Sequence, residues 1–281
     1  VEGTLSIDDG ARLAGGTLKL QGGGELSLVR DPSYYAWSVD GVLDGIEVWG
    51  DMTIASDYYG LQVFNGLTLL DETGSGNGTL TLQNTYSELL FQGTQTLHAG
   101  SIVLDGNTNT NMWVSGTGAV VTLATGTEII GGTGDIEFQN NATLVNEGLI
   151  SSEVSGKTLR IGGNGLSGTF QNEGTVQVIN GAALEIDAAN FVNNATIAPV
   201  VGSTLNIYAG AFTIAAADSL SVSGQGTLRL GDGSSVWDNQ GSVTGSDVGT
   251  NLILNGTWAN TGSITVSDAD VVFDGNFTAA D

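Results

Sequence analysis

The sequence predicts an all-β protein, a right-handed parallel β-helix in which short strands stack coil upon coil. A unit of 21 to 26 residues recurs through the second half of the chain, and each unit holds short segments with apolar residues at alternate positions. Glycine occupies 44 of the 281 positions against only two prolines, which indicates many tight turns. Units of this length cannot close a core alone, so their repetition is typical of a solenoid.

The repeat is clearest when the units are aligned on one asparagine. Ile214 takes the asparagine position in a degenerate copy, and Asp218 then falls where the other copies have a β-branched residue. Stacked asparagine side chains can hydrogen-bond from coil to coil, which avoids the cost of burying an unpaired amide. The aligned copies therefore predict a structural amide ladder. Its members are Asn146, Asn172, Asn193, Asn239 and Asn260.

Two further positions recur in the same alignment. A large apolar residue lies two residues before the asparagine, and we expect these side chains to fill the helix interior. A small residue lies two residues after it, where we expect either a positive φ or too little space for a side chain. The apolar residues are Leu144, Phe170, Phe191, Phe212, Trp237 and Trp258. The small residues are Gly148, Gly174, Ala195, Ala216, Gly241 and Gly262.

A second alternating segment lies between the asparagine motifs, as in residues 158–161 and 227–230. Such alternation predicts short half-buried strands. At about 22 residues per coil, the chain would form roughly 12 coils and a rod about 60 Å long. We expect one domain over residues 1–281, with less regular coils over 1–135, a loop near 30–37 and regular coils over 136–281.

The composition excludes several functional classes. Six basic and 30 acidic residues give a net charge of −24, which argues against binding nucleic acid or anionic membranes. No apolar stretch is long enough for membrane insertion. The absence of cysteine excludes disulfides and thiolate metal sites.

Several segments together resemble the β-helical repeats of very large bacterial surface proteins, the filamentous-haemagglutinin-like and autotransporter-like adhesins. They are residues 41–46, 65–69 and 91–97 and the Asn-x-Gly repeats. The resemblance covers nearly the whole chain and implies an extracellular or cell-surface protein with a structural or adhesive role. It implies no catalytic residues.

The residues themselves also give no convincing catalytic set, so we do not expect an enzyme. Neighbouring acids such as Asp268 and Asp270 are interpreted as solvated turn residues. Arg160 and Arg229 alternate with leucines and are expected to point outward. His98, the only histidine, is expected at a strand end. The alternative is a polysaccharide lyase or glycoside hydrolase of the β-helix type, which needs acids gathered on one face.

Two groups of residues are candidates for binding. Tyrosines spaced by about one coil could form a platform for sugar rings, or else an aromatic column packed at a turn. An acidic and amide-rich segment resembles the start of a calcium loop, although the closing glutamate is absent, and an ordinary turn is the alternative. We expect no other cofactor. The tyrosines are Tyr34, Tyr35, Tyr58, Tyr59 and Tyr86, and the calcium candidates are Asp105, Asn107 and Asn109.

These observations predict a non-enzymatic extracellular solenoid that serves as a stalk, fibre or surface-array segment. A parallel β-helix presents unpaired strand edges at its ends, and such edges recruit other chains. We therefore expect partners among further copies joined end to end, neighbouring domains of a longer chain, or surface glycans. A carbohydrate- or cell-binding module that uses the tyrosines is the second function to be weighed.

Overall fold

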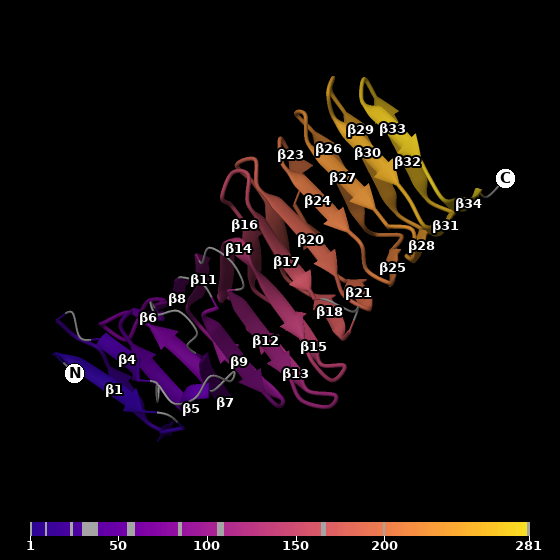
Figure 1. The fold of residues 1–281 in the computed structure, drawn as a ribbon. Helices are drawn as coiled ribbons and strands as arrows, with labels where there is room; N and C mark the ends of the chain where they lie inside the picture. Colours follow the sequence, from indigo (N-terminus) through magenta and orange to yellow (C-terminus); the bar gives the residue numbers. More distant parts are fainter. Residues whose placement is uncertain are drawn as a thin grey trace.

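The computed structural model describes residues 2–8, 10–22, 25–29, 39–54, 60–83, 86–105, 110–163, 167–198 and 200–279. Strand makes up 64% of the chain, and the described residues contain no helix. The strands stack in parallel into a β-solenoid of about 10 turns, and the chain runs in order from one end of the rod to the other (Figure 1). The all-β solenoid prediction is confirmed.

Three faces make up each regular coil, and each face is a ladder of parallel strands. Face 1 contains β2 (Arg12–Ala14), the first parts of β5 (Val39–Trp49) and β7 (Gly60–Leu70), β9 (Glu88–Gln92), β12 (Asn111–Ser115), the second part of β14 (Glu128–Phe138), β17 (Thr158–Gly162), β20 (Ala183–Asp187), β24 (Thr204–Ile207), β27 (Thr227–Leu230), β30 (Asn251–Leu254) and β33 (Asp270–Phe273).

Face 2 follows face 1 in each coil. It contains β3 (Thr17–Lys19), the second parts of β5 and β7, β10 (Gln95–His98), β13 (Val120–Leu123), β15 (Thr143–Asn146), β18 (Thr169–Asn172), β21 (Asn190–Asn193), β25 (Ala211–Ile214), β28 (Val236–Asn239), β31 (Thr257–Asn260) and β34 (Asn276–Ala279).

Face 3 completes the coil in two separate ladders. The first contains β6 (Met52–Ile54), β8 (Thr79–Gln83), β11 (Ser101–Asp105), the first part of β14, β16 (Leu149–Ser152), β19 (Thr175–Val178) and β22 (Thr196–Ile197). The second contains β23 (Val200–Val201), β26 (Ser219–Ser223), β29 (Ser242–Ser246) and β32 (Ser263–Ser267). A further pair, β1 (Thr4–Asp8) and β4 (Glu25–Val29), lies at the N-terminal end.

The prediction of roughly 12 coils was too high. Arg12 pairs with Val42, and Leu67 pairs with Leu97, so these coils take 30 residues each. Segments between strands, such as the turn after Leu70, lengthen the coils without adding height. About 10 turns at roughly 4.8 Å each give a rod about 48 Å long.

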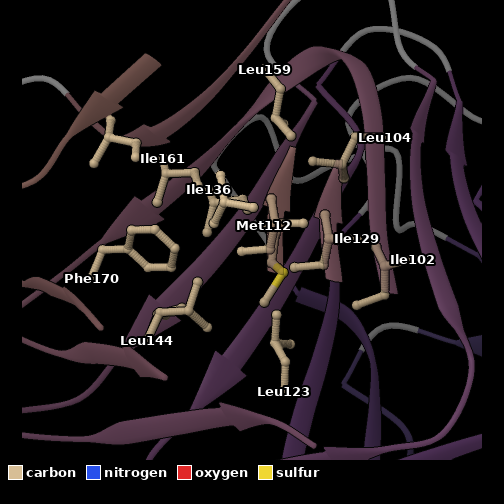
Figure 2. Close-up of a cluster of buried hydrophobic side chains, with 14 of the residues drawn as sticks. Ile102, Leu104, Met112, Leu123, Ile129, Ile136, Leu144, Leu159, Ile161 and Phe170 are labelled. Carbon is tan, nitrogen blue, oxygen red and sulfur yellow. The ribbon is translucent and has the colours of Figure 1, made fainter. Parts of the chain in front are cut away.

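Alternate side chains of every face point into a shared apolar core. Figure 2 shows part of it, where Leu144 and Phe170 of face 2 lie beside Ile136 and Ile161 of face 1. All four side chains are fully buried. In this interior, aromatic rings stack along the rod with centroid separations of 5.3 Å for Phe212 and Trp237 and 4.9 Å for Trp237 and Trp258.

The small residue after each asparagine is explained by space and not by a positive φ. At Gly174, a Cβ atom would lie 2.3 Å from the backbone oxygen of Gly148 on the preceding coil, and at Gly262 it would lie 2.1 Å from that of Gly241. Neither Gly174 nor Gly262 has a positive φ. The backbones of adjacent coils approach too closely here for any side chain.

The expected alignment of Asp218 was wrong. Leu220, and not Asp218, pairs with Val243 in face 3, so the apolar column continues without a break. Ile214 still pairs with Asn239 in face 2. Six positions separate Ile214 from Leu220, whereas four separate Asn239 from Val243, so this copy carries two extra residues in the turn.

Candidate functional site

The asparagines form a ladder that runs parallel to the rod inside the corner between faces 2 and 3. The amide nitrogen Nδ2 of Asn146 donates to Oδ1 of Asn172 at 2.8 Å, and Asn172 donates in the same way to Asn193 at 2.8 Å. Asn239 donates to Asn260 at 2.6 Å. The first three residues and Asn239 are buried, so this ladder has a structural role and presents no surface to a ligand.

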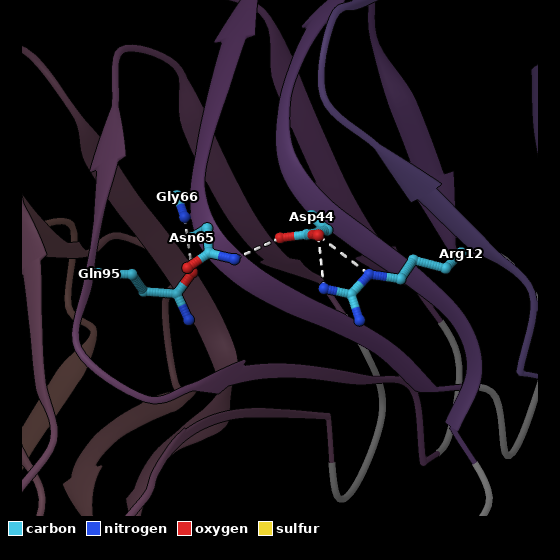
Figure 3. Close-up of polar contacts among 5 residues, drawn as sticks. All are labelled: Arg12, Asp44, Asn65, Gly66 and Gln95. Carbon is cyan, nitrogen blue, oxygen red and sulfur yellow. Dashed lines mark hydrogen bonds and ion pairs between the residues drawn. The ribbon is translucent and has the colours of Figure 1, made fainter.

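A second polar network lies near the N-terminal end of the rod (Figure 3). Arg12 Nε donates to Asp44 Oδ2 at 2.9 Å, and Asn65 Nδ2 donates to Asp44 Oδ1 at 2.6 Å. These bonds, first from Asn65 and then from Arg12, lower the pKa of Asp44. Next to them, Gln95 accepts a bond from the backbone N–H of Gly66. The network links successive coils at a turn.

Most of the predicted binding residues fall outside the described residues, namely Tyr34, Tyr35, Tyr58, Tyr59, Asn107 and Asn109. Tyr86 is half-buried in the turn before β9, where it has a φ of 61°. Asp105 is exposed at the end of β11. Within the part of the chain that the structure describes, no group of three or more His, Cys, Asp or Glu residues could hold a metal ion.

Charged side chains gather on the outer surface of face 1. Asp135 pairs in register with Arg160 on the next coil, and Arg160 pairs with Glu185 on the coil after that. Glu137 and Asp187 lie on the same strands as Asp135 and Glu185, two residues further on, and therefore on the same side of the sheet. We call these five residues the Arg160 cluster.

Arg160 is the centre of this cluster. Its Nε donates to Glu185 Oε2 at 3.1 Å, and its Nη1 forms an ion pair with Asp135 Oδ1 at 3.7 Å. Asn206 on the next coil also donates to Glu185, at 3.4 Å. Burial acts to lower the pKa of Arg160, but Asp135 and Glu185 outweigh it and raise the pKa. Arg160 is therefore held as a cation and is unsuited to act as a general base.

Glu137 is the carboxyl group with the most altered ionisation. Burial raises its pKa to about 7, and the negative charges of Asp135 and Glu88 add to this effect. Gly163 packs against it so closely that a Cβ atom there would lie 2.8 Å from Glu137 Oε2. Burial also raises the pKa of Asp135 and of Asp187. Near neutral pH, Glu137 can therefore hold or release a proton, which a general acid requires.

Sequence reasoning placed Arg160 on the surface but missed the acids around it. The pattern that locates them is the spacing: Asp135, Arg160 and Glu185 follow one another at 25-residue steps. The same step relates Glu137 and Asp187 through Gly162. These positions belong to the second alternating segment, where we compared the inward leucines and isoleucines and not the outward residues.

His98 is exposed at the end of β10, as its sequence position predicted. The described residues include no helix of the length and apolarity needed to cross a membrane. The chain matches no protein-family model, and it has no match among curated proteins or solved structures.

Proposed function

We propose that the chain is a non-enzymatic structural or adhesive solenoid, a stalk or fibre segment of an extracellular or cell-surface protein. The observation that carries this proposal is the continuous stack of coils, in which hydrogen bonds and aromatic contacts run along the rod from one coil to the next. Contacts of this kind resist bending and stretching of the rod. The net charge of −24 supports the proposal, because it keeps such rods from adhering to one another side by side.

End-to-end contact is the form of assembly that fits this rod best. At the C-terminal end of the described residues, Val272, Phe273 and Phe277 are about half exposed, at 49%, 50% and 52%. Phe277 already stacks on Trp258 with centroids 4.9 Å apart. A further coil, from a longer chain or from a second copy, would cover these side chains and continue the aromatic stack.

Negative-stain electron microscopy with calcium and with a chelator tests this proposal. We expect rods about 48 Å long per copy, single or joined lengthwise, of the same shape under both conditions. Rods that bundle along their sides, or that collapse when calcium is removed, would contradict it. Lengthwise fibres would identify the ends as the assembling surface.

Polysaccharide cleavage is the second candidate function, because Glu137 has the raised pKa of a proton donor and lies among three other carboxyl groups. Neutral and acidic polysaccharides should be incubated with the protein while new reducing ends and unsaturated products are measured. The structural proposal predicts no cleavage. Cleavage that disappears in Glu137→Gln and persists in Glu173→Gln, an exposed acid of another face, would make the chain an enzyme.

A further inference from the structure

The outer surface of face 2 is hollowed over the last five strands of that face. A groove of about 790 Å³ crosses β21, β25, β28, β31 and β34. At roughly 4.8 Å per strand, the groove extends about 19 Å along the rod. Its lining comes from the outward positions of these strands, whereas the stacked aromatic rings form the layer beneath.

The lining combines small or apolar side chains with uncharged polar ones. Val192 and Val236 are 40% and 58% exposed, and Ala211 is exposed beside them. Thr213 and Thr257 place hydroxyl groups between these residues. Flat apolar patches flanked by hydroxyl and amide groups are suited to a ligand with both apolar faces and hydroxyl edges.

One acidic side chain in the groove lacks a full set of partners. Asp238 Oδ2 accepts a hydrogen bond from Gln240 at 2.8 Å. Its other oxygen, Oδ1, has no hydrogen-bond partner among the described residues. A rotation about χ2 turns this oxygen toward the groove, where it can accept a bond from a ligand hydroxyl. Orphaned acceptors of this kind are uncommon in folded proteins and call for an explanation.

We propose that this groove binds a neutral glycan chain that lies along the rod. The lining contains no lysine or arginine, and the whole chain has a charge of −24, so an anionic glycan would be repelled. An extended peptide would find no backbone partners, because the strands of face 2 already pair with one another on both sides. A second copy of this acidic chain would bring like charges together, whereas a neutral glycan would not.

This inference deepens the adhesive part of the proposed function and gives it a ligand class. The test is calorimetric titration of the whole chain with four hexasaccharides: cellohexaose, mannohexaose, chitohexaose and, as the anionic comparison, hexagalacturonate. We expect at least one neutral hexasaccharide to bind and the anionic one not to bind. Failure of all three neutral probes, or equal binding of the anionic probe, would overturn the proposal.

Variants locate the binding on this face. Val236→Glu places a second acid in the groove, and Asp238→Ala removes the unpartnered acceptor; each should weaken binding at least tenfold. Val120→Glu and Gln171→Ala are matched controls, because these residues occupy the same two outward columns on earlier coils, outside the groove. Binding that survives both groove variants, or that falls equally in the controls, would place the glycan elsewhere.

Electron microscopy of every variant separates the two proposals. If a variant keeps its rods and loses binding, the groove is the glycan site. If the wild type forms rods and binds none of the neutral probes, the groove proposal fails and the structural proposal stands. If a groove variant loses its rods, Asp238→Asn replaces it, because the amide keeps the shape of the side chain while removing its charge.

Discussion

The side chain of Asn193 donates to Asp218, at 3.1 Å, and not to the residue that pairs one coil above the ladder position. Ile214 occupies that position, and the two extra residues of the turn bring the Asp218 carboxylate into the gap. A carboxylate accepts but does not donate. Asn239 Oδ1, on the next coil, is buried and has no hydrogen-bond partner among the described residues.

Replacing this carboxylate with an amide should therefore restore the ladder. In Asp218→Asn, the new side chain can accept from Asn193 and donate onward to Asn239 Oδ1, which should stabilise the neighbouring coils by about 1 kcal/mol. Amide hydrogen exchange in β25 and β28 measures the change. Faster exchange in the variant would show that the negative charge is itself required at this turn.

Removing a rung from the intact part of the ladder should have the opposite effect. Asn172 accepts from Asn146 and donates to Asn193 and to the backbone oxygen of Thr196. Asn172→Ala leaves a buried acceptor on Asn193 without its donor and should cost roughly 2 to 4 kcal/mol.

Hydrogen exchange in β18 and β21 reports this loss locally. Gln171→Ala is the control, because Gln171 lies on the outer side of the same strand. Its effect should remain within about 0.5 kcal/mol. Equal effects of the two substitutions would mean that the amide contacts contribute little to the stability of the coil.

The closest approach of adjacent coils gives a third prediction. In Gly174→Ala, the added methyl group would meet the backbone oxygen of Gly148, so the coils must separate locally and the stability of the rod should fall by more than about 2 kcal/mol. Gly233→Ala is the matched control, because a Cβ atom at Gly233 would have no neighbour within 4 Å. Thermal denaturation followed by circular dichroism compares the two. Similar melting temperatures would contradict the prediction.

The ionisation of Glu137 predicts how stability depends on pH. The folded-state pKa of about 7 lies above the ordinary value of 4.5, so folding favours the protonated form. This contribution to stability is complete below about pH 4.5 and is lost as the pH rises through about 7. The wild type should therefore lose stability relative to Glu137→Gln over this interval.

Glu173 provides a control of opposite sign. Hydrogen bonds from Gln171 and Asn194 lower its pKa. Its contribution is present above the ordinary pKa of 4.5 and is lost as the pH falls through the lowered value. Denaturant titrations of the wild type, Glu137→Gln and Glu173→Gln at several pH values measure both effects. A wild type and Glu137→Gln that respond alike to pH would refute the assignment to Glu137.

The sequence was a good guide to what repeats and a poor guide to what does not. The spacing of residues such as Phe170 and Trp258 located the inner aromatic column, because stacking forces one residue per coil into the same environment. The height of the rod was overestimated, since the coils that contain Val42 and Leu97 are lengthened by segments with no repeating pattern.

The candidate site was harder to predict for a related reason. Outward positions carry no shared packing constraint, so Asp135, Arg160 and Glu185 differ from coil to coil although they share one column. Only their 25-residue step links them. The groove over face 2 left no pattern at all, because a hollow depends on which outward side chains are small, such as Ala211, and on the curvature of the sheet.

The close match between neighbouring coils has a consequence for how such a chain can change during evolution. Thr169 pairs with Asn190 and Asn190 with Ala211, so two successive coils are 21 residues each. Removing residues 190–210 would set Phe170 directly beneath Phe212 and leave most of the strand pairing intact. Because each coil contacts only its neighbours, genetic duplication or loss of one unit changes the reach of the molecule by about 4.8 Å. Reach is thus a heritable quantity that varies in whole steps, independently of the surfaces the other coils display.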